Sequence, residues 1–410
     1  MAFGLTKKEL SWVLYDVGNS AFVMLSTALI PVYFASIADP GSSVVVAWGY
    51  AETVASLVLA LLMPVLGSLA DLAGNKKKFL VGFAGTGAVA CAALGIPEHA
   101  LAFLVVYVIA AIMLNGSMVF YDAFLVDATT EERYDKVSSH GYAWGYIGSC
   151  IPFIACLAVV LGGSSFGIDA KLGMKIAFVI TAVWWVIFTV PVAKNVKQLH
   201  GKKRSDHVLR TTISGLKGTV KSIMKDKRLL FFMLAFFFYI DGVHTVIKMS
   251  TSYGTDLGID STQLVLALLV TQFVAFPSAI AYGNLAKRFG TKRMLKVGVL
   301  AYFFIVLFAA FFLKSAVEFW ILAICVGLFQ GGIQALSRSE YGKLIPKERA
   351  NEYYGFFDIF GKYAAVMGTF LVSAFTQLTG SSSLGVLSIA LLFIVGFLFL
   401  RAMPPMLGDS

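Results

Sequence analysis

Two stretches of the chain carry the same pattern and decide the fold: GSLADLAGNKK at residues 67–77 and GNLAKRFGTKR at residues 283–293. They start 216 residues apart and share the pattern Gly-x-Leu-Ala-x-x-x-Gly-x-basic-basic. The shared glycines are Gly67 and Gly74 in the first copy and Gly283 and Gly290 in the second. Asp71 of the first copy is replaced by Lys287 in the second. A repeat at half-length indicates a duplicated structural unit.

A second pair of matches lies near the same offset. Asn115-Gly116 corresponds to Gln330-Gly331, and residues 131–133 (Glu-Glu-Arg) correspond to residues 347–349 (Lys-Glu-Arg). We therefore predict two six-helix halves related by a pseudo-twofold axis along the membrane normal. Their expected bounds are 1–193 and 229–410, joined by a basic linker over 194–228 that contains an amphipathic helix.

Composition places most of the chain in lipid. Of its 410 residues 58% are hydrophobic and 14% are charged, against about 25% charged in soluble domains. A spanning helix needs about 20 apolar residues, and we expect an all-α membrane protein with twelve such helices. The predicted segments are 11–37, 43–66, 78–96, 100–125, 138–161, 172–193, 229–250, 261–283, 294–313, 317–337, 353–376 and 384–402.

The basic residues cluster in alternate loops, which predicts the topology. The loops that hold Lys76, Lys77, Arg133 and Lys292 share one side with both termini, while the opposite loops hold few cations. The positive-inside rule makes the basic side cytoplasmic. We expect a multi-pass plasma-membrane protein, and the net charge of +10 is assigned to anionic lipid and topology rather than to nucleic acid.

The remaining composition argues against an enzyme. The four cysteines lie in apolar stretches without metal-ligand spacing, so no metal or cofactor is expected. The chain contains no HExxH pattern and no nucleophile elbow, and Gly355 to Lys362 has the wrong spacing for a Walker A loop. An intramembrane enzyme and an ATP-driven pump are both disfavoured.

The first repeat copy resembles the signature loop of the major facilitator superfamily, which lies between the second and third helices. The resemblance implies that the loop latches the two halves during alternating access. The glycines allow close helix approach, Asp71 can cap a neighbouring helix end, and Lys76 and Lys77 hold the loop at the cytoplasmic side. Lys287 leaves the same role for the second copy in doubt.

Further stretches resemble the vacuole-effluxer-like family, related to the autophagy vacuolar amino-acid exporter. They are WVLYDVGNSAF (12–22), FYDAFL (120–125), SSHGYAWGYIGS (138–149) and QGGIQALSRS (330–339). The resemblance covers both halves and implies transport of a small solute, with amino acids as the best-supported class.

Polar residues inside the first half are candidates for substrate or ion binding, because an ionisable group at the bilayer centre costs roughly 2.5–3.5 kcal/mol. Asp16 and Asn19 share one helix face, and Asn115 and Asp122 share another, beside Tyr121. A packing cluster near the interface remains the alternative for the Asp16 face. Asp122 could pair with Arg338 as a gate between the halves.

The second half offers three polar groups. Asp241 and His244 lie on one face with Lys248 and could form a proton relay, or could simply pair with each other. Gln330, Gln334 and Arg338 recur every four residues and could bind a carboxylate, join helices or, for Arg338, anchor the topology. Asp358 and Lys362 most simply form an intrahelical ion pair, although they could open to bind a zwitterion.

We therefore expect a monomeric secondary transporter that works by alternating access, facilitative or proton-coupled, on an amino acid or a similar amphipathic solute. Its expected partners are that solute, membrane lipids and protons. A lipid, lysolipid or drug transporter of the same fold is an alternative. A channel or a non-transporting receptor is the alternative from another class.

Overall fold

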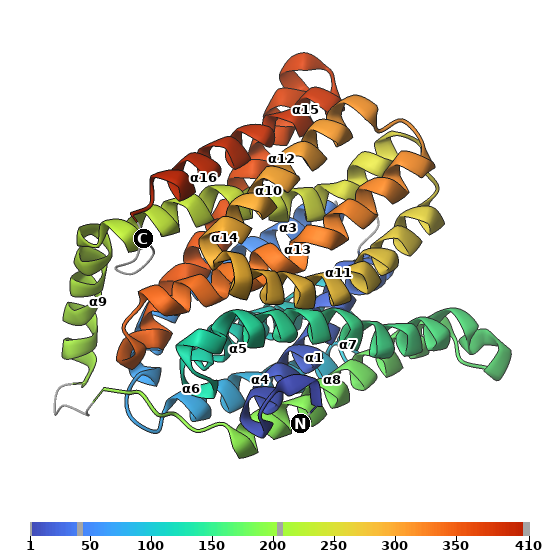
Figure 1. The fold of residues 1–410 in the computed structure, drawn as a ribbon. Helices are drawn as coiled ribbons and strands as arrows, with labels where there is room; N and C mark the ends of the chain where they lie inside the picture. The colour runs from blue at the N-terminus through green and yellow to red at the C-terminus, as the bar shows by residue number, and fades with distance from the viewer. Residues whose placement is uncertain (1, 39–43, 203–207, 405–410) are drawn as a thin grey trace. The chain divides into compact units, whose positions relative to one another are not determined.

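The computed structural model describes residues 2–38, 44–202 and 208–404, and over these residues the chain is helical (Figure 1). Within these ranges it forms no strand, and one isolated bridge joins Leu72 to Lys202. Large apolar side chains such as Leu61, Val89 and Leu161 point outward and are at least 70% exposed. Outward-facing apolar side chains are expected where helices contact hydrocarbon.

The described residues up to Lys225 form nine α-helices. Sequence signals explain where the first of them begins and ends. Thr6 and Glu9 form a capping box at its start, and the chain bends by 43° before the helix that carries Pro31 near its start. The helices are α1 (Lys7–Ala28), α2 (Ile30–Ile37), α3 (Val44–Ala70), α4 (Lys76–Ala93), α5 (Ala100–Ala123), α6 (Leu125–Ala128), α7 (Tyr134–Gly162), α8 (Ala170–Asn195) and α9 (Val208–Lys225).

The second part contributes seven more α-helices. They are α10 (Lys227–Asp256), α11 (Ser261–Phe289), α12 (Thr291–Phe312), α13 (Ala316–Leu344), α14 (Ala350–Thr379), α15 (Ser382–Ser388) and α16 (Ala390–Ala402). Asp226 caps the start of α10 through the backbone N–H groups of Arg228 and Leu229. Short 3₁₀ turns at Glu131–Arg133 and Lys347–Arg349 precede α7 and α14, so the matched tripeptides have the same structural place.

Each of the twelve predicted segments lies on a helix or on a broken helix pair. By length and composition, nine helices in the described ranges can cross a bilayer, or ten if α1 and α2 form one broken span. The three lysines at the start of α4 (Lys76–Lys78) account for its absence from that set, and α14 includes residues 362–366, whose side chains lie outside the described residues. The all-helical membrane fold is confirmed, while the count of twelve stays a prediction.

The chain divides into two compact units. Unit 1 contains residues 1–130, 144–212 and 347–355, and unit 2 contains residues 131–143, 213–346 and 356–410. Each unit thus includes a short segment from the other half of the sequence. The predicted division at 193 and 229 is not tested by this clustering and stays a prediction.

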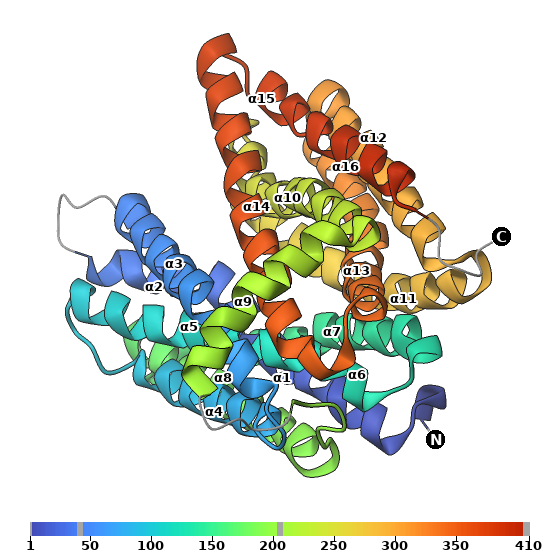
Figure 2. The same ribbon diagram turned by 90° about the vertical axis from the view of Figure 1, so that its left-hand side faces the viewer.

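Close glycine contacts pack the helices inside each unit. In unit 1, a side chain at Gly18 would lie 2.9 Å from Phe188 in α8, and one at Gly148 would lie 2.6 Å from Val17 in α1. In unit 2, Gly332 of α13 packs on the Tyr282 ring of α11, and α12, α15 and α16 lie together (Figure 2). Glycine at these positions allows two helices to approach closely.

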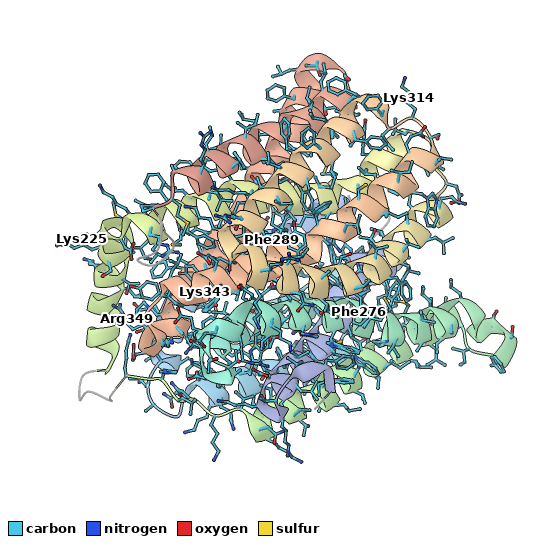
Figure 3. All side chains as sticks on the ribbon, viewed as in Figure 1. Lys225, Phe276, Phe289, Lys314, Lys343 and Arg349 are labelled. Carbon is cyan, nitrogen blue, oxygen red and sulfur yellow. The ribbon has the colours of Figure 1, made fainter. Side chains whose placement is uncertain are left out.

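The predicted amphipathic linker helix corresponds to α9. The side chains of Leu209 and Ile213 lie outside the described residues. An amphipathic helix has one apolar face, and of the apolar side chains of α9 Ile223 is buried, whereas Val220 is 43% exposed. Lys217, Lys221 and Lys225 are exposed; Figure 3 shows Lys225 at the junction with α10.

Candidate transport site and gating loops

The first signature loop docks on the start of α14, inside unit 1. A side chain at Gly67 would lie 2.6 Å from the backbone oxygen of Asn351, so only glycine fits this approach. Oδ1 of Asp71 accepts hydrogen bonds from the backbone N–H (2.9 Å) and side-chain amide (2.8 Å) of Asn351. Oδ2 of Asp71 accepts one from the backbone N–H of Glu352 (3.0 Å). Asp71 therefore satisfies the free N–H groups of the helix start.

Burial has a measurable effect on Asp71. The residue is 1% exposed, and desolvation raises the pKa of its carboxyl to about 6, against the opposing effects of Lys76 and of the hydrogen bonds from Asn351 and Glu352. This loop residue lies beyond the end of α3, outside the membrane-spanning segment. Its protonation therefore changes close to neutral pH.

Lys76 is enclosed by protein, which its position in a run of three lysines did not indicate. It is fully buried, and its Nζ lies 2.6 Å from Oδ2 of Asp127 and 3.2 Å from the backbone oxygen of Ala123. Gly74, with φ +82°, makes the turn that leads into it. The carboxylate of Asp127 compensates the burial of this amine, and the placing of Lys76 on the cytoplasmic side stays a prediction. Lys77 is half-buried.

The start of the linker wraps this loop. Gln198 Oε1 accepts hydrogen bonds from the backbone N–H groups of Gly74 and Lys76. Lys202 donates its backbone N–H to Asp71 O (2.7 Å) and its Nζ to Glu352 Oε2 (2.6 Å). His200 donates its backbone N–H to Asp127 Oδ1. Residues 198–202 thus fix the loop, rather than forming a solvated connection.

The second loop docks on the start of α7, inside unit 2, with the charges arranged differently. A side chain at Gly283 would lie 2.6 Å from Ser139 Oγ, and Gly290 has φ +87°. Lys287 is exposed and does not take the place of Asp71. The carboxylate here is Asp135 on α7, which Lys343 and Thr291 approach at 2.8 Å.

Two further hydrogen bonds complete this second cluster. Ser339 donates its hydroxyl to Asp135 Oδ1. Lys343, which Figure 3 labels near the end of α13, also donates to Thr291 Oγ1 (2.7 Å). The second copy therefore holds its helix start through an acid on the helix and a cation on α13.

Arg338 is a buried residue of α13. It is 1% exposed, donates Nε to Ser138 Oγ (2.9 Å) and Nη2 to Ser138 O (3.0 Å), and lies over the Tyr142 ring. Its guanidinium is enclosed at the start of α7, and the alternative in which Arg338 anchors the topology stays a prediction. Pairing of Asp122 with Arg338 stays a prediction, since the two residues belong to different units.

Asp16 lies in an aromatic cluster inside unit 1. Tyr121 donates its hydroxyl to Asp16 Oδ2 (3.0 Å), and its ring stacks on Trp12 with centroids 4.3 Å apart. Tyr15 donates to Ser117 Oγ on α5 (2.6 Å). The structure thus brings the predicted residues Asp16 and Tyr121 together, and it holds the carboxylate with a phenol at 4% exposure.

The two predicted asparagines mainly bond their own helices. Asn19 donates its amide to Tyr15 O, while its Oδ1 is buried without a hydrogen-bond partner in the described structure. Asn115 donates to Ala111 O and is half-buried. An unpartnered buried acceptor such as Asn19 Oδ1 is a ready contact for an N–H donor.

Asp241 is the most enclosed acid of unit 2. It is 0% exposed, and its Oδ1 accepts hydrogen bonds from the backbone N–H of Gly368 (2.9 Å) and from Thr245 Oγ1 (3.2 Å). Its Oδ2 has no hydrogen-bond partner within the described residues. A side chain at residue 368 would lie 2.6 Å from Asp241 Oδ1, so glycine is required for this contact.

His244 faces α14 beside Asp241. Its ring lies close to the backbone of Gly361, and Asp241 accepts a hydrogen bond from the backbone of Gly368 on the same helix. The described hydrogen bonds of Asp241 go to Thr245 and Gly368 and not to His244. They do not support the alternative in which Asp241 and His244 pair with each other.

The remaining candidates divide between α13 and α14. Gln334 donates its amide to the backbone oxygen of Gln330, and Gln330 is 3% exposed. Asp358 is half-buried. The side chain of Lys362 lies outside the described residues, so the predicted ion pair between these two residues stays a prediction.

Several residues that build these contacts were missed from the sequence. They are Asp127, Asp135, Ser138, Gln198, His200, Lys202, Thr291, Ser339, Lys343 and Glu352. The offset of 216 residues could have found some of them, because it aligns Asp127 with Lys343 and Asp135 with Asn351. In the described part of the chain, no group of three or more His, Cys, Asp or Glu side chains could hold a metal ion.

Comparisons with known proteins agree with this architecture. The family described as "Vacuole effluxer Atg22 like" matches residues 41–127 and 126–406. The chain is 46% identical over 408 residues to the "Uncharacterized MFS-type transporter YxiO" of Bacillus subtilis (strain 168), covering 97% of this chain and 95% of that protein. It is 26% identical over 283 residues to "Autophagy-related protein 22" of Cryptococcus neoformans, covering 63% of this chain and 48% of that longer protein.

Solved structures share the fold at low identity. The transporter FucP in the outward conformation matches with a TM-score of 0.73 at 14% identity, over 97% of this chain and 99% of that one. The proton:xylose symporter XylE matches with a TM-score of 0.72 at 10% identity, over 97% and 94%. Together with the family match, these likenesses identify a multi-pass membrane transporter: the chain belongs to the Atg22-like family of the major facilitator superfamily.

Proposed function

We propose that this protein is a proton-coupled secondary transporter that moves a small amphipathic or zwitterionic solute, an amino acid or a close relative, by alternating access. The fold supports transport without supplying a substrate. The family description, a vacuole effluxer, supports solute movement across a membrane. The coupling proposal rests on the acids inside the helices.

The observation that carries the proposal is the environment of Asp241. A carboxylate inside a span costs roughly 2.5–3.5 kcal/mol on insertion scales, and Asp241 has no cation among its hydrogen-bond partners. Both bonds go to Oδ1, and Oδ2 has no protein partner in the described ranges. This arrangement suits a carboxylic acid that carries its proton on Oδ2 and releases it when water reaches the site.

Asp16 has the opposite environment. The Tyr121 hydroxyl donates to Oδ2 of Asp16, whereas Oδ2 of Asp241 has no partner in the described ranges. Trp12 and Tyr15 pack against the same Tyr121 ring. We assign Asp16 to the ammonium group of the solute and Asp241 to the proton.

Transport into liposomes tests the coupling. The purified chain is reconstituted, and uptake of radiolabelled amino acids is measured with and without a pH gradient, beside exchange without a gradient. Asp241→Asn should abolish gradient-driven accumulation and keep exchange, because the amide preserves the bonds at Oδ1 but cannot release a proton. Asp226→Asn, at the exposed cap of the same helix, is the matched control and should accumulate solute normally.

Three results would overturn the proposal. If solute accumulation by the wild-type protein does not depend on the pH gradient, transport is not coupled to protons. Flux that rises linearly with solute concentration, without saturation or exchange, would favour a channel. Saturable uptake of lysolipid or drug in place of amino acids would favour the alternative transporter of the same fold.

We also propose a cell-membrane location with both termini in the cytoplasm, and a monomeric carrier. Support comes from the exposed Lys7 and the half-buried Lys8 near the amino terminus, and from the exposed Arg401 near the carboxyl terminus. Thiol labelling of single cysteines placed at Ala2 and Ala402 of a cysteine-free variant in intact cells tests the topology. Labelling from outside at either position would contradict it.

A further inference from the structure

The linker helix α9 ends where a membrane-spanning helix begins. Its last residue is Lys225 and α10 starts at Lys227, so one residue separates the two helices. The part of α10 from Lys227 to Ser250 is long and apolar enough to cross a bilayer. Residues 213–225 of α9 and all of α10 belong to unit 2, and Figure 1 shows α9 running across the direction of α10. This arrangement brings the end of α9 to the bilayer surface.

Two apolar side chains near the end of α9 face away from the protein. Val220 is 43% exposed and Met224 is 65% exposed, and they lie one turn apart on the same side of the helix. Thr219 and Ile223, each one residue earlier, are buried. The helix therefore packs on the protein with one face and presents Val220 and Met224 as a second, exposed apolar strip.

A row of lysines borders this apolar strip. Lys217, Lys221 and Lys225 recur every four residues and are exposed. Lys221 and Lys225 directly follow the two residues of the strip in sequence, so they lie beside it on the helix surface. None of the three forms an ion pair with another of the described residues. Like charges at this spacing repel one another, and a negatively charged surface beside them would compensate that repulsion.

Few acids near the row compensate its charge. Residues 216–227 contain four lysines and one acid, Asp226. The carboxylate of Asp226 accepts hydrogen bonds from the backbone N–H groups at the start of α10. Arg228, the next cation, pairs with Glu340 at 3.4 Å and is not part of the row. The end of α9 thus carries an excess of positive charge beside exposed apolar surface.

The combination of charge and apolar surface selects among possible partners. A soluble polyanion would satisfy the lysines but leave the apolar strip in water. An uncharged bilayer would bury the strip but leave the lysines uncompensated. A bilayer with anionic headgroups does both, which is how basic amphipathic helices bind to membranes.

We propose that the end of α9 docks on an anionic bilayer. Val220 and Met224 enter the boundary between headgroups and acyl chains, about 5–10 Å deep for a helix of this kind. Lys217, Lys221 and Lys225 contact lipid phosphates. The partner is a lipid surface that carries negative headgroups, and the docking depends neither on proton coupling nor on the identity of the solute.

Spin labels on the full-length chain test the docking. Met224→Cys and Ser222→Cys are made separately in a cysteine-free variant, labelled, and placed in nanodiscs of phosphatidylcholine with or without phosphatidylglycerol. Accessibility is measured to oxygen, which partitions into lipid, and to a water-soluble nickel chelate. In anionic discs the label at residue 224 should be reached by oxygen and shielded from nickel.

Ser222 is the matched control for the position of the label. It is exposed and lies on the opposite side of the helix from Met224, because two residues correspond to about half a turn. Its label should stay accessible to the nickel chelate in both kinds of disc.

Replacement of the lysines isolates the contribution of charge. Lys217→Gln, Lys221→Gln and Lys225→Gln should each lower the ratio of docked to undocked helix by roughly fivefold in anionic discs. Salt at 1 M, where the screening length is about 3 Å, should weaken the docking of the unsubstituted row. Lys287→Gln, at an exposed lysine of the second signature loop, should leave the label at residue 224 unchanged.

Three outcomes would overturn the inference. Equal nickel accessibility at residues 222 and 224 in anionic discs would show a solvated helix. A label at residue 224 that is shielded from both reagents would show that protein covers the strip. Docking that is the same with and without phosphatidylglycerol, or in the lysine variants, would remove the anionic lipid from the proposal.

Discussion

The two signature loops share their backbone conformation at the glycines but carry opposite charges at one position, Asp71 in the first and Lys287 in the second. Both place a glycine against the start of a helix, at Gly67 and Gly283, and both turn through a glycine with positive φ. The first loop carries its acid on the loop, as Asp71, whereas the second carries an exposed lysine there and takes its acid from the helix, as Asp135.

The inversion extends beyond the loops. The offset of 216 residues aligns Asp122 with Arg338 and Asp127 with Lys343. Duplication has thus preserved close backbone contacts, which depend on glycine, while the side-chain charges were exchanged. A contact geometry constrains the backbone tightly, but either sign of charge can satisfy it if its partner changes too.

The largest expected difference between the copies concerns their lysines. Lys76→Met leaves Asp127 fully buried without its cation and should cost about 3–5 kcal/mol of unfolding free energy. The equivalent Lys292→Met removes a half-buried amine that bonds the backbone oxygen of Met403, and should cost about 1 kcal/mol. Denaturation in mixed micelles measures both, and equal losses would contradict the asymmetry.

The second comparison concerns the position of the acid. Asp71→Ala leaves the start of α14 without its cap and should cost about 1–3 kcal/mol, while Lys287→Ala should stay within about 0.5 kcal/mol. Asp71→Asn should fall between them, since its amide oxygen can keep the bonds from Asn351. Hydrogen exchange at the start of α14 reports the loss locally, and unchanged protection in Asp71→Ala would count against the cap.

Replacement of the turn glycine should destabilise the two loops by similar amounts. Gly74 and Gly290 have φ of +82° and +87°, and Gly290 has ψ 141°. Other residues are strained at such φ, so Gly74→Ala and Gly290→Ala should each cost about 1–3 kcal/mol. Gly82→Ala is the control inside α4, where an added side chain meets no atom within 4 Å, and it should not destabilise. Thermal unfolding of the three variants checks this; strain in only one loop would end the parallel between their backbones.

The smallest expected effect is a pH dependence limited to the first loop. Desolvation raises the pKa of Asp71 from its ordinary 3.8 to about 6. The folded state therefore binds this proton more tightly, and the stability gained is complete below pH 3.8 and lost as the pH rises through 6. Wild-type protein should gain stability relative to Asp71→Asn as the pH falls across that window, measured by thermal midpoint. A constant difference would show that burial does not shift this group.

Much of the fold and the outline of the loops followed from the chain itself. Repeated glycines located both close contacts, and apolar segment lengths located the helices. The site was harder to predict. Lys76 is one of three consecutive lysines, a pattern typical of a cytoplasmic loop. Its partner Asp127 is distant in sequence, so the buried ion pair could not be predicted.

The sequence alone determined that the chain lies in a bilayer as a duplicated helical bundle. Hydrophobic partition and backbone hydrogen bonding within helices depend on composition and local order, and these are readable residue by residue. The tertiary structure decided which charges are paired and which oxygen of Asp241 lacks a partner. Such contacts require atoms from distant segments to come within hydrogen-bonding distance, and Asp71 meets a partner 280 residues away.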